Sequence, residues 1–294
     1  MILPEFRKKE ILKLLAESPD VSVSRSREQL SWGVSVPGDE SQVMYVWIDA
    51  LSNYITVLGY PDRDVSEWWP AAAQFVGKDI LRFHAIIWPA MLMGLGLPLP
   101  KAIISHGFVL VDGQKMSKSI GNVVDPIEVL NKYGTDAFRY YFLRHIDTFD
   151  DSDFTWEKYE NAYNNELAND LGNLVQRLAV MAHKNDISVE NQAVEYVFDE
   201  EYVKMMNNYE FSRAFDCVWE KVQSINKKID NEKPWILAKN GEIDKLKKCL
   251  CGLIKELLIA NYMLSPFLPD TTGKIYEVFD GAVEPPKTPL FPKS

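Results

Sequence analysis

The sequence changes character near residue 157, and this change limits the folds that the chain can adopt. Before that point, short apolar runs alternate with helical patterns. We expect strands at Tyr45–Ile48, Gln74–Val76, Ala102–Ile104 and Phe108–Val111, and a helix over Asp79–Leu95. Alternation of this kind predicts an α/β domain with a largely parallel sheet.

Beyond residue 157 the pattern is helical throughout. Apolar residues recur at three- and four-residue steps, as one buried face of a helix requires. This stripe consists of Tyr163, Leu167, Leu171, Leu174 and Leu178. A second long helix is expected over Ile243–Met263, and the proline-rich tail from Val283 is expected to be extended. We therefore predict two domains, an α/β domain at 1–157 and an all-α domain with an extended tail at 158–294.

Composition excludes several classes of protein. The chain has 294 residues, of which 47% are hydrophobic, so it can bury a large core. Its three cysteines are too few and too badly spaced for a disulfide framework, which fits a reducing cytoplasm. No apolar run approaches the ~18 residues of a membrane span, so we expect no membrane association. The net charge of −10 shows no overall basic footprint for nucleic acid, although local aromatic or basic sites can bind RNA on an acidic protein.

The segment Lys115–Ser119 reads Lys-Met-Ser-Lys-Ser and follows an Asp-Gly turn. Two ammonium groups and two hydroxyls on a loop suit a triphosphate whose α-phosphate is attacked, because preplaced cations stabilise the charge that builds there. The alternative is a solvated Lys/Ser surface loop. A specified pentapeptide occurs by chance in on the order of one in ten thousand chains of this length, which favours the phosphate interpretation.

This pentapeptide resembles the nucleotide-binding signature of class I aminoacyl-tRNA synthetases. The flanking segments His106–Val109 and Gly121–Pro126 agree with it, and Tyr133–Tyr141 is similar to the segment that links the catalytic and helical domains in that family. The resemblance implies a partial Rossmann-like catalytic domain followed by an anticodon-binding helical bundle.

Two further segments carry aromatic residues at helical spacing. Trp47, Leu51 and Tyr54 share one side of an expected helix, and His84 and Trp88 lie four residues apart on another. Such walls suit an unbranched thioether, which gains dispersion and sulfur–aromatic contacts. The spacing alone is more typical of an ordinary core.

Both segments resemble the methionine-binding segments of methionyl-tRNA synthetases. The resemblance implies a methionine pocket formed by Trp47, Ala50, Leu51, Tyr54, Ile80 and His84. Leu51 stands where many relatives have proline.

The resemblance also implies the remaining site residues. Those for ATP are Gly77, Asp79, His106, Val109, Lys115 and Lys118, with Gly77 and Asp79 near the ribose and Val109 near the adenine. Lys115, Ser117 and Lys118 are the expected catalytic residues. The expected cofactor is ATP with Mg²⁺, and no zinc site is expected in this chain.

The helical region carries the expected RNA contacts. Asn173 and Arg177 are four residues apart and project from one face, while Pro234 fits a helix start that holds Trp235 outward as a stacking platform. The alternatives are a tryptophan packed in the bundle and a solvated Asn/Arg pair. By resemblance, Asn173, Arg177, Pro234 and Trp235 match the anticodon-recognising positions of methionyl-tRNA synthetases.

One family signature is missing. No histidine of the chain lies in a His-Ile-Gly-His motif, which binds the triphosphate opposite the lysine loop in this family. We therefore expect the later portion of a methionine–tRNA ligase, inactive alone, with methionine, ATP, tRNA(Met) and the missing first half as partners. Two alternatives stay open: a non-catalytic tRNA-binding module, and a class I synthetase for leucine, isoleucine, valine or cysteine.

Overall fold

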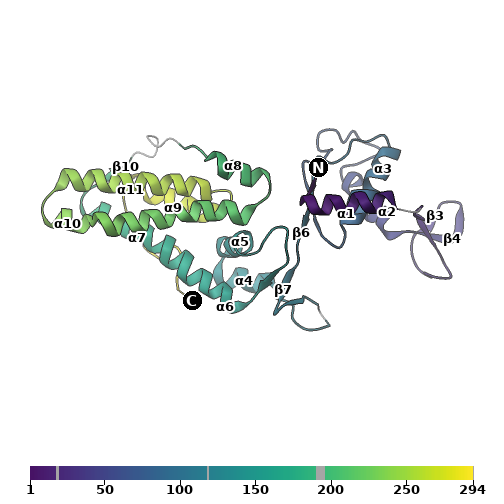
Figure 1. Ribbon diagram of the computed structural model, residues 1–294, viewed down its shortest axis with the longest axis horizontal. Coiled ribbons are helices and arrows are strands. Elements are labelled where there is room, and N and C mark those ends of the chain that lie inside the picture. Colours follow the sequence, from purple (N-terminus) through teal and green to yellow (C-terminus); the bar gives the residue numbers. More distant parts are fainter. Residues whose placement is uncertain (18–19, 118, 190–195, 294) are drawn as a thin grey trace. The chain divides into compact units, whose positions relative to one another are not determined.

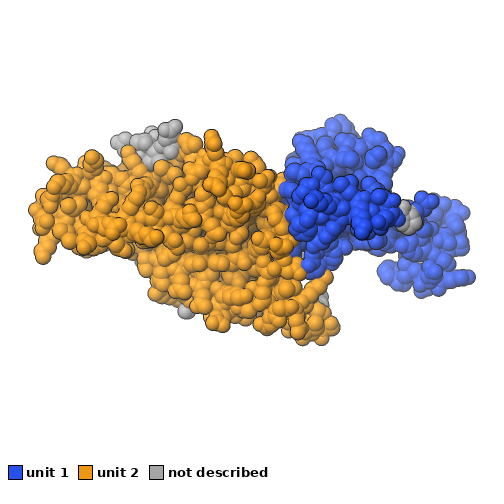
Figure 2. All heavy atoms as spheres, in the orientation of Figure 1, with its two compact units in different colours: residues 1–108 blue, residues 109–294 orange. Residues whose placement is uncertain are grey.

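The computed structural model describes residues 1–17, 20–117, 119–189 and 196–293. They form two compact units, residues 1–108 and residues 109–294, which Figure 2 shows in different colours. This division follows compactness alone, and the predicted domain boundary near residue 157 stays a proposal.

Unit 1 contains the parallel sheet. Its strands are β1 (Ile2–Leu3), β6 (Ile103–His106) and β5 (Gln74–Gly77), in the order β1-β6-β5. Both neighbouring pairs run parallel, and Gly77 lies opposite His106 where β5 and β6 end together. The prediction of parallel strands near residues 74 and 103 is confirmed.

A second sheet in unit 1 is antiparallel and comprises β2 (Ser24–Ser26), β4 (Asp39–Met44) and β3 (Ser35–Val36). The expected strand at Tyr45–Ile48 is wrong, because helix α2 (Val46–Thr56) begins there directly after β4. A run of four aromatic and β-branched residues fits the first turn of a buried helix as well as a strand.

The helix predicted over residues 79–95 is confirmed, but its regular part begins later, at Phe83. Its regular part comprises a π-helical turn, η1 (Phe83–Ile87), followed by α3 (Trp88–Gly94). Helix α1 (Glu5–Ala16) packs against β1 and contributes Ile11 to a small core beside the parallel sheet. A separate core gathers Leu51 and Ile55 of α2, Trp88 and Leu92 of α3, and Trp69 of the loop between them.

Unit 2 opens with a small sheet that carries the lysine loop. Strand β7 (Val109–Val111) pairs antiparallel with β8 (Gln114–Lys115) and parallel with β9 (Ser152–Phe154). Helices α4 (Pro126–Tyr133) and α5 (Thr135–Arg144) follow the loop. The strand predicted at residues 108–111 is confirmed.

Helical structure then continues from Trp156 to Lys184 without a break. It comprises α6 (Trp156–Asn161), the π-helical segment η2 (Ala162–Gly172) and α7 (Asn173–Lys184). The predicted apolar stripe is confirmed, since all five of its residues are buried in the main core of unit 2. A π-helix shifts the register of the side chains that follow it, so η2 decides which way the residues of α7 point.

The remaining elements complete a helical bundle (Figure 1). They are α8 (Glu200–Asn207), α9 (Phe211–Glu232), α10 (Pro234–Lys239), α11 (Ile243–Leu264), α12 (Pro269–Val278) and the strand pair β10 (Ser188–Val189) and β11 (Gly281–Ala282). Helices α9 and α11 lie side by side, and the tail beyond β11 is non-helical as predicted. Across the described residues, no helix is long and apolar enough to cross a membrane.

A carboxylate of η2 connects three elements of the bundle. Glu166 accepts hydrogen bonds from the Tyr140 hydroxyl at 2.5 Å and from His145 Nε2 at 2.7 Å, and it pairs with Arg144 at 3.3 Å. Arg144 also donates to Asp216 of α9 at 3.1 Å. Burial alone raises the pKa of Glu166, but these hydrogen bonds and the arginine charge outweigh it and leave the pKa lowered.

We predict that Glu166→Gln destabilises the fold at neutral pH by about 1–3 kcal/mol, because it leaves charged donors incompletely paired. A lowered carboxylate pKa stabilises the native state above the unfolded pKa, and this contribution is lost as pH falls through the folded pKa. The variant should therefore lose less stability than the parent between about pH 5 and pH 3. Urea unfolding at several pH values measures both effects.

The matched control is Glu160→Gln. Glu160 also accepts from a tyrosine hydroxyl, at 2.7 Å from Tyr133, and pairs with Lys132, but its side chain is 43% exposed. Solvent screening should make its loss smaller. Equal effects of the two variants would show that the Glu166 network contributes no more than a surface pair.

Candidate functional site

A buried histidine lies at the centre of the aromatic cluster in unit 1. His84 is 2% exposed, and its Nδ1 lies 3.0 Å from the carbonyl oxygen of Ile80. A carbonyl can only accept, so Nδ1 carries the proton. In the neutral ring Nε2 is then an acceptor, and the Tyr54 hydroxyl donates to it at 2.9 Å.

The charge of this pair follows from its burial. Burial lowers the pKa of His84, more than the hydrogen bond to the Ile80 carbonyl raises it, so the ring is neutral at pH 7. Burial also raises the pKa of the Tyr54 phenol, which keeps its proton. The two side chains therefore form one neutral polar group within an apolar wall.

Aromatic rings surround this pair. Trp47 stacks on Phe83 with ring centroids 4.0 Å apart and meets His84 edge-on at 5.9 Å. Tyr54 lies 5.9 Å from Trp88 on its other side. The structure thus brings Trp47, Tyr54 and His84 together as the sequence suggested. Phe83 was missed, although its place beside His84 in the sequence was a usable signal.

The other predicted pocket residues take different positions around this cluster. Leu51 is fully buried beneath it, Ala50 is exposed, and Ile80 lies in the turn before the helix with its carbonyl on His84. Ile80 packs against the small core beside the parallel sheet, whereas Trp88 belongs to the core of α2 and α3.

A cavity of about 480 Å³ opens beside the start of α2, and the predicted pocket residues do not line it. Its walls come from the antiparallel sheet and the loop of Trp32, together with Tyr45, Val46 and Asp49. Arg25, which also lines it, stacks over the Tyr45 ring at 3.9 Å. Sequence reasoning did not identify this cavity.

The predicted ribose residues gather where β5 and β6 end. The carboxylate of Asp79 lies close to Gly77. A β-carbon added at Gly77 would stand 2.9 Å from Asp79 Oδ1, and the His106 ring is also near that position. Carboxyl ends of parallel strands are the usual ligand-binding edge of an open α/β sheet. Gly77, Asp79 and His106 therefore share one edge of unit 1.

The lysine loop of unit 2 is held by its own polar groups. Asp112 and Gly113 both have positive φ, which allows the tight turn between β7 and β8. The backbone N–H of Ser117 donates to Asn122 at 2.8 Å, while Lys115 is exposed at the end of β8. Lys118 lies outside the described residues, so its predicted role is not tested.

Two of the predicted RNA residues, Asn173 and Arg177, line the same polar cavity of unit 2. Asn173 and Arg177 line a cavity of about 750 Å³ together with residues of α9. Arg177 donates to Asp230 at 2.8 Å, and Asn173 donates to Asn169 at 3.4 Å. Asp230 was missed, and no feature of the sequence marks it as the partner of Arg177.

The predicted stacking platform is exposed. Lys233 adopts a left-handed conformation that ends α9, and Pro234 begins α10 as predicted. Pro234 is buried, whereas Trp235 is 44% exposed. Trp235 is not among the residues that line the cavity of Arg177.

We predict that His84 is protonated at Nδ1 and not at Nε2 at pH 7, since the Ile80 carbonyl fixes this tautomer. Nitrogen NMR of labelled protein distinguishes the two forms. Tyr54→Phe should shift the Nε2 resonance by removing its donor. Tyr60→Phe should not, because Tyr60 packs on the neighbouring core and, among the described residues, forms no hydrogen bond with His84. A proton found on Nε2 would contradict the arrangement.

Comparison with known proteins gives the family. Residues 3–179 match the model of the class I tRNA synthetases of the methionine type, described as "tRNA synthetases class I (M)". The methionine–tRNA ligase of Caldanaerobacter subterraneus is 43% identical over 94% of this chain, and that of Thermotoga maritima is 38% identical over 98%. The chain spans 46% and 48% of these two relatives, about half their length.

A solved structure of a methionyl-tRNA synthetase supports the same family. Mycobacterium tuberculosis methionyl-tRNA synthetase in complex with methionyl-adenylate superposes with a TM-score of 0.85 and 32% identity, covering 99% of this chain and 64% of that one. The mixed α/β and helical fold predicted from the sequence is thereby confirmed. The chain belongs to the class I tRNA synthetases of the methionine type, the family of the methionine–tRNA ligases.

Proposed function

We propose that this chain is the later part of an enzyme that activates methionine with ATP and transfers it to tRNA(Met). The observation that carries the proposal is the neutral His84–Tyr54 pair enclosed by Trp47 and Trp88. A thioether side chain is unbranched and polarizable, and it gains dispersion and sulfur–aromatic contacts against such rings. Leu51, fully buried below them, supports the wall and Ala50 leaves room beside it.

The reaction proposed is formation of methionyl adenylate. A carboxylate oxygen of methionine attacks the α-phosphorus of ATP, the bond to the β-phosphate oxygen breaks, and pyrophosphate leaves. Negative charge builds on the phosphorus and the leaving group, so Lys115 and Lys118 would act by preplaced charge and Ser117 by hydrogen bonding. Attack of a tRNA terminal hydroxyl on the adenylate then releases AMP.

ATP and its Mg²⁺ enter this reaction as substrate. Gly77, Asp79 and His106 are proposed to bind the ribose side of ATP, and Val109 the adenine. Within the described parts of the chain, no group of three or more His, Cys, Asp or Glu side chains is arranged for a metal. The phosphates themselves are therefore the proposed ligands of the magnesium ion. A cytoplasmic location also stays a proposal.

The parallel sheet supports a second chain, or a preceding segment, as partner. Within the described residues, β5 pairs with β6 on one side and forms an edge of the parallel sheet of unit 1. An open edge of a parallel sheet favours pairing with a further strand. Because the relatives are about twice as long, we propose that their first half supplies the structure that covers this edge.

A non-catalytic RNA-binding module is the second candidate. The observation that favours it is the large, continuous core of unit 2, which supports Asn173 and Arg177 without help from unit 1. Such a module would bind RNA but form no adenylate, so a measurement of adenylate formation separates the two candidates.

We predict that the chain alone catalyses no methionine-dependent exchange of pyrophosphate into ATP. Adding the first half of the Caldanaerobacter relative as a second chain should restore exchange. In that mixture Tyr54→Ala should raise the KM for methionine and leave the KM for ATP nearly unchanged, because Tyr54 contacts the aromatic wall. Robust exchange by the chain alone, or a change confined to ATP, would contradict this assignment.

We also predict that Trp235→Ala weakens binding of methionine tRNA by about 1–3 kcal/mol, the usual contribution of one stacked base. Thermal stability should change little, since the indole is 44% exposed. Trp68→Ala is the matched control, because Trp68 is also exposed, at 69%, but lies in unit 1. Filter binding beside a thermal melt gives both quantities. A large stability loss with unchanged tRNA affinity would make Trp235 a core residue.

A further inference from the structure

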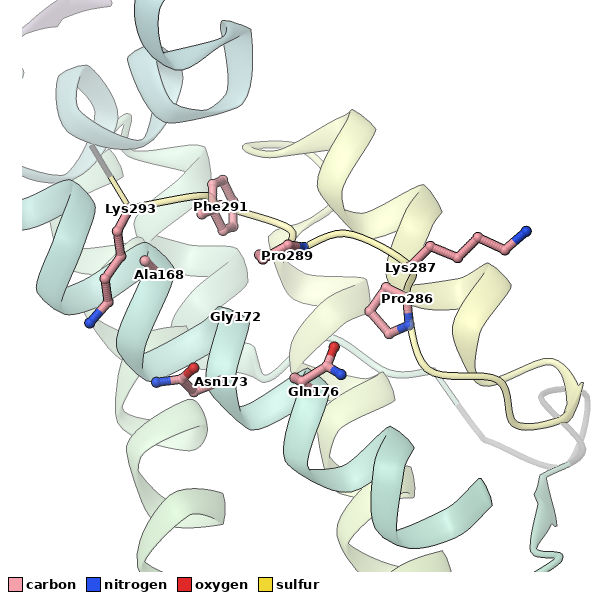
Figure 3. Close-up of a pocket in the computed structure, with 9 residues that line it drawn as sticks. All are labelled: Ala168, Gly172, Asn173, Gln176, Pro286, Lys287, Pro289, Phe291 and Lys293. Carbon is pink, nitrogen blue, oxygen red and sulfur yellow. The ribbon is translucent and has the colours of Figure 1, made fainter. Parts of the chain in front are cut away.

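A second cavity in unit 2 lies between α7 and the C-terminal tail. Its volume is about 450 Å³ (Figure 3). The helical side is formed by Ala168, Gly172, Asn173 and Gln176, and the tail side by Pro286, Lys287, Pro289, Phe291 and Lys293. Asn173 also lines the polar cavity of Arg177, so one side chain borders both.

The tail is fixed at this place by specific contacts. The Tyr163 hydroxyl donates to the Pro292 carbonyl at 2.8 Å, and the Tyr163 ring meets Phe291 edge-on at 6.1 Å. Phe291 is buried, and further back along the tail Val283 accepts from His183 at 3.1 Å. The wall made by the tail is therefore part of the folded unit.

The lining combines apolar surfaces with amide groups. The rings of Pro289 and Phe291 and the small residues Ala168 and Gly172 leave room for a flat apolar group. The half-buried side-chain amide of Gln176 forms no hydrogen bond with any residue in the part of the chain that the structure describes. An amide presents one acceptor and two donor positions, the groups that recognise the edge of a nucleobase.

The side chains that line this cavity carry a net positive charge, although the whole chain has a net charge of −10. Its two charged residues are lysines, and none of its residues is acidic. In Figure 3 the side chain of Lys293 runs back past Ala168 toward Asn173, whereas that of Lys287 extends away from the cavity. Lys293 is thus placed to meet an anion at the mouth, and Lys287 is not.

We propose that this cavity binds one unpaired nucleotide, with the base against Phe291 and Pro289, the base edge on Gln176 and the phosphate on Lys293. The inference rests on the proposed RNA-binding function, since the shared Asn173 joins this cavity to the predicted anticodon face. The nucleotide is then a second unpaired position of the bound RNA. A free mononucleotide would present the same chemistry, and the experiment distinguishes the two sources.

The test compares three variants of the full chain in binding an anticodon stem-loop RNA of methionine tRNA. Gln176→Met keeps the length of the side chain and should weaken binding about fivefold, the effect of one lost hydrogen bond. Lys293→Gln should lower the slope of log affinity against log salt by about one, as expected for one lost phosphate contact. Lys287→Gln is the control on the same tail. Its effects on the affinity at low salt and on the salt slope should both be smaller than those of Lys293→Gln.

Each outcome decides the inference. If the RNA binds and Trp235→Ala weakens it, but Gln176→Met and Lys293→Gln behave like the parent, the cavity is no nucleotide site and the proposed function still stands. If the RNA does not bind, the proposed function fails, and titration with AMP and CMP, followed by NMR through the backbone amides of Ala168 and Gly172, tests the cavity alone. Saturable binding that Gln176→Met abolishes would then support a free-nucleotide site, whereas absence of binding would overturn the inference. Thermal melts of all variants show whether each remains folded.

Discussion

The helical unit depends on one carboxylate, Glu166, which receives donors from Tyr140, Arg144 and His145. Because these donors lie in α5 and at its C-terminal cap, and Glu166 belongs to η2, the network fixes the long helix against the helix that follows the lysine loop. Arg144 extends the network to Asp216 of α9. A partly buried charge with several well-placed donors gives a defined geometry even where its net stabilisation is modest.

The position of the proposed RNA-binding face follows from that geometry. The π-helical register of η2 ends at Gly172, and Asn173 and Arg177 come directly after it on α7. The Arg177 guanidinium is then held by Asp230, which fixes the direction of its donors before any ligand arrives. In unit 1 the Ile80 carbonyl has a similar effect, because it selects the tautomer of His84 and so the direction of the Tyr54 hydrogen bond.

Much of this could be predicted from the sequence, for identifiable reasons. The strand at residues 74–77 and the long apolar stripe that includes Leu171 were predictable because burial imposes periods that differ between strands and helices. The strand expected at Tyr45–Ile48 was wrong because the true strand, Asp39–Met44, is largely polar and the apolar run belongs to the next helix. The two π-helical segments had no local signal.

The candidate site was predictable only in part. The aromatic wall could be inferred because Trp47, Tyr54 and His84 recur at helical spacing. The Arg177–Asp230 pair and the cavity under the tail could not be inferred, because each joins residues far apart in the sequence through the packing of the bundle. Long-range contacts of this kind depend on tertiary structure and leave no local pattern.

The central claim, which both candidate functions share, is that this chain reads RNA sequence through its helical unit. It is tested most directly by titrating the chain with a methionine tRNA transcript and with the same transcript altered at one anticodon base. The account predicts a loss of affinity of about 1–3 kcal/mol for the altered transcript, the usual discrimination of a contacted base. Equal affinities for the two transcripts would contradict it.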